Sequence, residues 1–117
     1  MQKNYILGTC STCIRLMNDW NPGNDVQLQD IKSDPITEEQ IDQMAELAGS
    51  YEALFSRRAM KFRGLGLHER ELSEKEFRNY ILKEYTFLKR PVVIVNDQIF
   101  IGNSKKTALE VHHALNP

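Results

Sequence analysis

The chain has 117 residues, of which 41% are hydrophobic and 26% are charged, and its formal net charge is −1 at pH 7. This length fits one folded domain, and the balanced charge gives no reason to expect direct binding to nucleic acid or to an anionic membrane surface. No apolar run approaches the roughly 20 residues that span a bilayer, and the first residues do not resemble a signal peptide. We therefore expect a cytoplasmic protein.

The first predicted elements are a strand at 5–7 and a helix at 11–20, joined by a short loop that ends in Cys10. A sulfur at a helix N-terminus faces unpaired backbone N–H groups and the positive end of the helix dipole, and both favour thiolate over thiol. Cys13 follows almost one turn later, close enough to attack a mixed disulfide formed at Cys10. The C-x-x-C spacing next to a β-α-β pattern indicates a redox dithiol. The apolar positions of this helix, which we expect to be buried, are Ile14, Leu16, Met17 and Trp20.

Three other interpretations of the cysteine pair are open. The pair could be a redox sensor whose disulfide changes the binding of a partner, or two reduced thiols on an inert scaffold. It could also be half of a zinc site, which would need about two more ligands. The three histidines, at 68, 112 and 113, show no ligand spacing near the pair, so we expect no metal.

The middle of the chain reads as a strand followed by helices. A turn at 21–24 leads into a half-exposed strand at 26–31, in which apolar and polar residues alternate. Thr37 with Gln40 forms a capping box that opens a helix ending at Gly49. A second helix is predicted from 51 to about 60. The capping box of Ser73 and Glu76 opens a third.

The C-terminal part is a β-hairpin followed by a helix. The run 92–95 is the strongest strand signal in the chain, and a two-residue turn returns it as a second strand at 98–101. The last helix carries four residues that we expect to face inward: Ala108, Leu109, Val111 and Leu115. The first β-α-β unit should form a right-handed parallel crossover. The length and the element order together predict a single α/β domain over 1–117. We expect a thioredoxin-like fold with a four-stranded mixed sheet, helices on both faces, and a helical insertion at about 37–88.

With this fold in view, the chain resembles the arsenate reductase (ArsC) family, most closely its Spx/YffB-like branch. The resemblance rests on residues 5–13, on the Ser-Arg-Arg segment that ends at Arg58, on the Gly-Leu motif near Leu65, and on an Arg-Pro followed by an apolar strand at 90–94. It implies that Cys10 is the nucleophile and that Cys13 is the second cysteine of the pair. It further implies an anion-binding Arg90, a cis proline at Pro91, and a mid-chain anion-binding arginine at Arg58 or, one position earlier, Arg57.

Three departures count against arsenate reduction. Ile6-Leu7-Gly8 replaces the family's His-Asn-Pro, Ile14 occupies the place of an arginine, and Gly102 occupies the place of the third oxyanion arginine. An oxyanion needs several convergent charged donors, and each lost contact costs about 1.5–3 kcal/mol. We therefore expect arsenate turnover to be crippled.

The resemblance favours a monomeric thiol–disulfide oxidoreductase without a bound cofactor. Its co-substrate would be a thiol such as glutathione, or a thioredoxin or glutaredoxin partner. The alternative is a Spx-like regulator that binds the C-terminal domain of the RNA polymerase α subunit and uses the same two cysteines as a redox switch.

Overall fold

The computed structural model describes residues 2–20 and 26–115, so the turn predicted at 21–24 lies outside the described residues. The described chain divides into two compact units. The first combines the N-terminal part up to Asp34 with the C-terminal part from Arg90, and the second spans Pro35–Lys89.

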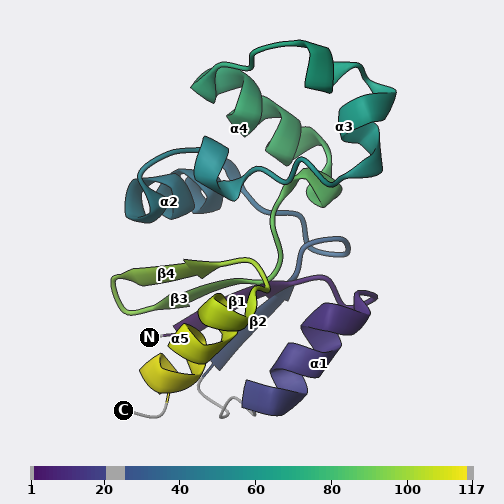
Figure 1. Ribbon diagram of the computed structural model, residues 1–117. Coiled ribbons are helices and arrows are strands. Elements are labelled where there is room, and N and C mark those ends of the chain that lie inside the picture. The colour runs from purple at the N-terminus through teal and green to yellow at the C-terminus, as the bar shows by residue number, and fades with distance from the viewer. Residues whose placement is uncertain (1, 21–25, 116–117) are drawn as a thin grey trace. The chain divides into compact units, whose positions relative to one another are not determined.

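The first unit is built on a four-stranded sheet with strand order β2-β1-β3-β4 (Figure 1). The strands are β1 (Gln2–Ile6), β2 (Val26–Asp30), β3 (Val92–Val95) and β4 (Gln98–Ile101). β1 pairs in parallel with β2 and antiparallel with β3, and β3 pairs antiparallel with β4. The predicted mixed four-stranded sheet is confirmed.

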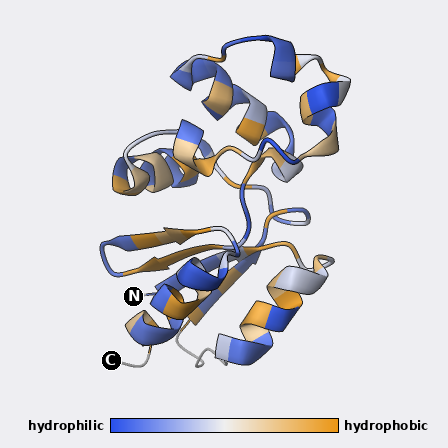
Figure 2. Ribbon diagram, viewed as in Figure 1, coloured by the Kyte–Doolittle hydropathy of each residue, from blue (hydrophilic) through white to orange (hydrophobic). Residues whose placement is uncertain are grey.

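Two helices, α1 (Ser11–Trp20) and α5 (Lys105–Leu115), share the core of the first unit with the sheet. The buried members of this core are Leu16, Trp20, Val93 and Val111. The Trp20 Nε1–H also donates to the Ala108 carbonyl at 3.1 Å, which ties α1 to α5. Figure 2 shows how uniformly hydrophobic β3 is, as expected of a central strand whose residues Val92 and Val93 are both fully buried.

Some faces differ from the prediction. Ile14 and Leu109 are exposed by 49% and 59%, although both were expected to be buried. In α1 the buried residues Cys13, Leu16 and Trp20 are three and four positions apart, a spacing that leaves Ile14 outside the apolar stripe.

The burial of residues in β2 does not follow the predicted alternation of apolar and polar positions. Leu28 is 55% exposed, whereas Gln29 is buried. Burial of this amide is made possible by its hydrogen bond, in which Gln29 Nε2 donates to the Asp34 carbonyl at 3.0 Å. The hydrophobic pattern alone therefore does not give the burial of the residues in this strand.

The second unit consists of short helices. They are α2 (Glu38–Ala48), the 3₁₀ turn η1 (Glu52–Leu54), α3 (Met60–Gly64), η2 (Leu67–Glu69), α4 (Glu74–Lys83) and η3 (Tyr85–Phe87). Both predicted capping boxes are formed, Thr37 with Gln40 and Ser73 with Glu76. Gly49 ends α2 in the left-handed conformation, with φ +95°, and its N–H donates to the Ala45 carbonyl.

The helix predicted from 51 to about 60 is wrong. Helical structure there is limited to η1, and α3 begins only at Met60. Between them, Phe55 forms an antiparallel bridge with Leu88, and the Ser56 N–H donates to the Phe87 carbonyl at 2.7 Å. This long-range pairing uses backbone groups that a continuous helix would need for its own hydrogen bonds.

Aromatic rings fill the centre of the second unit. Phe55 is fully buried, and its ring centroid lies 5.0 Å from that of Phe87 and 4.9 Å from that of Phe77. Phe62 completes the group at 5.9 Å from Phe55. Packing of this kind contributes beyond the burial of the ring area alone.

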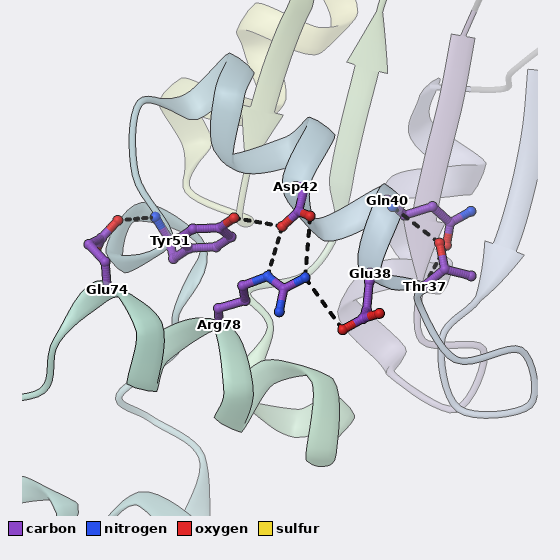
Figure 3. A network of polar contacts seen from close by, with 7 residues as sticks. All are labelled: Thr37, Glu38, Gln40, Asp42, Tyr51, Glu74 and Arg78. Carbon is purple, nitrogen blue, oxygen red and sulfur yellow. Dashed lines mark hydrogen bonds and ion pairs between the residues drawn. The ribbon is translucent and has the colours of Figure 1, made fainter.

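A polar network joins α2 to α4 within the same unit (Figure 3). Arg78 on α4 donates to both carboxylate oxygens of Asp42 on α2, from Nε at 2.8 Å and from Nη2 at 3.3 Å. The Tyr51 hydroxyl donates to the same Asp42 at 2.6 Å, and the Tyr51 N–H donates to Glu74. Together these bonds hold the pKa of the Asp42 carboxyl below its ordinary value, chiefly through the hydrogen bonds from Arg78 and then Tyr51.

Candidate functional site

The loop after β1 places Cys10 directly before the first residue of α1. The Cys10 N–H donates to the Leu7 carbonyl at 2.9 Å, and the Cys10 carbonyl accepts from the Ile14 N–H at 3.1 Å. Cys10 is therefore the N-cap residue of α1. Its side chain presents a sulfur at the place where N-cap residues usually present an oxygen. Its sulfur stands where the unpaired N–H groups of the first helical turn are directed.

The Cys10 sulfur lies in an environment that stabilises its thiolate. Partial burial by itself raises the pKa of the Cys10 thiol. Hydrogen bonds from the backbone N–H groups of Cys13 and Thr12, a hydrogen bond from the Cys13 thiol, and the charge of Arg90 outweigh that effect. The net pKa of Cys10 is lowered, which makes this partly exposed sulfur the more nucleophilic of the two.

Cys13 is shifted in the opposite direction. The residue is 1% exposed, and burial is the main reason why the pKa of its thiol rises to about 11. A backbone hydrogen bond at Leu7 and the charge of Arg90 lower the pKa of Cys13, whereas the neighbouring Cys10 raises it further. Cys10 therefore loses its proton before Cys13, and the Cys13 thiol keeps its proton and donates a hydrogen bond to the Cys10 thiolate.

The positive charge of Arg90 lowers the pKa of both cysteines, and part of its guanidinium donates no hydrogen bond. Its Nε and Nη1 are buried and have no hydrogen-bond partner in the described part of the chain. Unsatisfied buried donors are rare in folded proteins and point to a missing partner. The peptide bond between Arg90 and Pro91 is cis, the isomer that the family resemblance implied.

The two mid-chain arginines belong to the second unit. Arg57 forms an ion pair with Glu52 at 2.8 Å, and its guanidinium carbon lies 5.5 Å from the centroid of the Phe77 ring. Arg58 is exposed and makes no hydrogen bond or ion pair within residues 2–20 and 26–115. Of the predicted site residues, the structure brings together Cys10, Cys13 and Arg90, and it groups Arg57 with Glu52 and Phe77.

Sequence reasoning missed the contact between Gly8 and Asp30. A Cβ atom added at Gly8 would lie 2.6 Å from Asp30 Oδ2, closer than side chains tolerate. Glycine therefore lets the end of β2 approach the loop that carries Cys10. The sequence did contain a signal for this contact. Gly8 lies just after the end of the first strand, two residues before Cys10, and a glycine at such a position often marks the close approach of another segment.

Within the two described ranges, no group of three or more His, Cys, Asp or Glu side chains is placed to hold a metal ion. None of the described helices has the length and apolar character needed to cross a membrane.

A mixed β2-β1-β3-β4 sheet with a C-x-x-C at the start of its first helix defines a thioredoxin-like protein. The sequence matches the model of the ArsC family over residues 5–111, and the chain belongs to this family. Among curated proteins, no sequence match was found.

Solved structures of several proteins share this fold. The chain is similar to a protein described as YffB, with a TM-score of 0.80 at 18% identity, covering 98% of this chain and 99% of the other. It is similar to an arsenate reductase from Vibrio cholerae, with a TM-score of 0.78 at 18% identity and coverage of 94% and 96%. A possible arsenate reductase from Streptococcus mutans is 26% identical, with a TM-score of 0.69 and coverage of 90% and 92%.

Proposed function

We propose that this ArsC-family protein is a thiol–disulfide oxidoreductase in which Cys10 attacks and Cys13 resolves. The observation that carries the proposal is the opposite displacement of the two cysteine pKa values, downward for the partly exposed Cys10 and upward for the buried Cys13. Groups whose environments separate their pKa values in this way take distinct chemical roles.

The reaction balances as a two-electron exchange. The Cys10 thiolate attacks one sulfur of a substrate disulfide, forms a mixed disulfide, and expels the other sulfur as a thiolate that takes up a proton. Cys13 then gives up its proton and attacks the Cys10 sulfur, which releases the second substrate thiolate. The substrate is reduced, and a Cys10–Cys13 disulfide remains for an external thiol donor such as glutathione, or a thioredoxin or glutaredoxin partner, to reduce.

The guanidinium of Arg90 supports a substrate with negative charge near its disulfide. Its two buried, unpartnered donors suit a carboxylate of a small thiol such as glutathione. The family resemblance implies a second anion contact from a mid-chain arginine, and we propose Arg58 for this role because it is exposed and makes no hydrogen bond or ion pair with any described residue. Ile14 and Gly102 stand where arsenate reduction would require arginines, so we propose that arsenate is not an efficient substrate.

Intact-mass measurement tests the two cysteine roles. Reduced Cys13→Ser protein mixed with the disulfide of glutathione and 2-mercaptoethanol should accumulate a Cys10 adduct, whereas Cys10→Ser protein should form none and lose turnover. Absence of an adduct in Cys13→Ser would contradict the proposal. If the protein retains the RNA polymerase α subunit in a pull-down experiment and reduces none of the disulfides, the result would favour the Spx-like regulator instead.

A charge comparison tests Arg90. Arg90→Gln should lower kcat/KM for the glutathione disulfide by about tenfold or more, and should lower it less for the uncharged disulfide of 2-mercaptoethanol. Arg58→Gln tests the second contact in the same assay. The matched control is Arg63→Gln, an exposed arginine outside the proposed site, which should leave both substrates unaffected. Equal losses for charged and uncharged disulfides would remove the anion contact from the proposal.

A further inference from the structure

The second unit contains an open cavity of about 350 Å³ that the proposed redox chemistry does not use. Its volume falls in the range of small-molecule sites. The apolar part of the lining comes from Phe62, Leu72 and Phe77. Because Phe77 and Phe62 both pack on the buried Phe55 ring, this wall belongs to the core of the unit and is held in place.

The cationic part of the lining comes from Arg57 and Arg70. Arg57 uses Nη2 to hold Glu52, and Arg70 uses Nη2 to hold Glu76. A guanidinium carries five N–H donors, so each arginine keeps donors for a further acceptor. The ion pairs restrain both side chains at the edge of the cavity while their charges remain available.

The anionic part of the lining comes from Glu52 and Glu71. Glu52 is already paired with Arg57, whereas Glu71 has no hydrogen bond or ion pair with any described residue. Two positive and two negative side chains therefore line the cavity, together with an aromatic wall. A simple anion would be repelled by the two carboxylates, and a simple cation would be repelled by the two guanidinium groups.

We propose that this cavity binds a free α-amino acid with a large apolar side chain. The carboxylate of the ligand is held by Arg57 and Arg70, and its ammonium group by Glu71. The apolar side chain lies against Phe62, Leu72 and Phe77. A zwitterion of this kind satisfies both signs of charge and the apolar wall at once.

The test uses the full-length protein and L-phenylalanine as the probe. Titration followed by backbone amide chemical shifts should give saturable changes at the cavity residues. Two analogues separate the charged contacts: 3-phenylpropionate lacks the ammonium group, and phenethylamine lacks the carboxylate. Each should bind about tenfold more weakly or worse, because each loses a charge-assisted interaction. No saturable change up to about 10 mM, near saturation for a millimolar Kd, would overturn the proposal, and so would equal binding of either analogue.

A matched pair of variants tests the role of Glu71. Glu71→Gln should weaken binding of L-phenylalanine by about tenfold, whereas Glu69→Gln changes an exposed carboxylate outside the cavity and should leave it unchanged. Equal affinity in Glu71→Gln and the unmodified protein would refute the assignment. The Cys10→Ser protein should bind the amino acid normally, so this proposal and the redox proposal can fail independently.

Discussion

The raised pKa of Cys13 should make the reduced protein lose stability in alkali, and replacing Cys13 should remove this loss. Its pKa rises from an ordinary 9.0 to about 11 in the folded state, mainly through burial. A group with a raised folded-state pKa contributes stability that is fully present below its unfolded-state pKa and is lost as the pH rises through its folded-state pKa. A difference of two pKa units corresponds to a contribution of about 3 kcal/mol to the free energy of unfolding, and about 1 kcal/mol of this contribution is lost by pH 10.

The assay is urea unfolding of the reduced protein between pH 8 and pH 10.5, compared with the Cys13→Ala variant. The Ala side chain adds a pH-independent loss of packing, so the diagnostic quantity is the difference in slope between the two curves. Alkaline groups that do not interact with Cys13, such as Tyr5 with its burial-raised pKa, cancel in this difference. Cys10→Ser is the control, and it should keep the alkaline loss because burial of Cys13, the largest cause, is unchanged. Equal slopes in Cys13→Ala and the unmodified protein would refute the reasoning.

Three further predictions concern the second unit. Phe55→Ala should lower the free energy of unfolding by about 3–5 kcal/mol, measured by urea denaturation, because its fully buried ring contacts three other phenylalanines; a loss below about 1 kcal/mol would contradict this packing. Thr37→Ala and Ser73→Ala should each cost about 1 kcal/mol in thermal unfolding, because each removes a capping box; a loss at only one site would show that the other box is dispensable. Arg78→Met should raise the pKa of Asp42 in an NMR titration. Since Asp42 stabilises the fold above its unfolded-state pKa and loses this effect as the pH falls through its lower folded-state pKa, the variant should also lose less stability in acid.

Local signals predicted the parts of the fold that depend on short-range chemistry. The capping boxes at Thr37 and Ser73 form as predicted because side chain and backbone partners lie within four residues of each other. The hairpin of β3 and β4 is also local in the sequence, because a turn of two residues joins its strands. The helix predicted from 51 to about 60 failed because Phe55 pairs with Leu88, a partner 33 positions away that no local pattern reveals.

The faces of individual residues were harder to predict than the elements. Leu28 is exposed, whereas the polar Gln29 is buried, where its amide donates to the Asp34 carbonyl. A hydrophobic pattern contains no information about such a partner. The same limit applies to the site: the sequence placed Cys10 at the start of a helix, but the unpartnered donors of Arg90 depend on tertiary packing.

The two sulfurs are only three residues apart, and their burial gives the proposed reaction its order. An external disulfide can reach the partly exposed Cys10, whereas Cys13 is inaccessible and protonated. Cys10 raises the pKa of Cys13 both by its negative charge and by accepting the hydrogen bond from the Cys13 thiol. Once Cys10 is bound in a mixed disulfide, it carries no charge and both effects disappear. The pKa of Cys13 then falls at the step in which its thiolate is needed, so formation of the first disulfide itself activates the resolving cysteine.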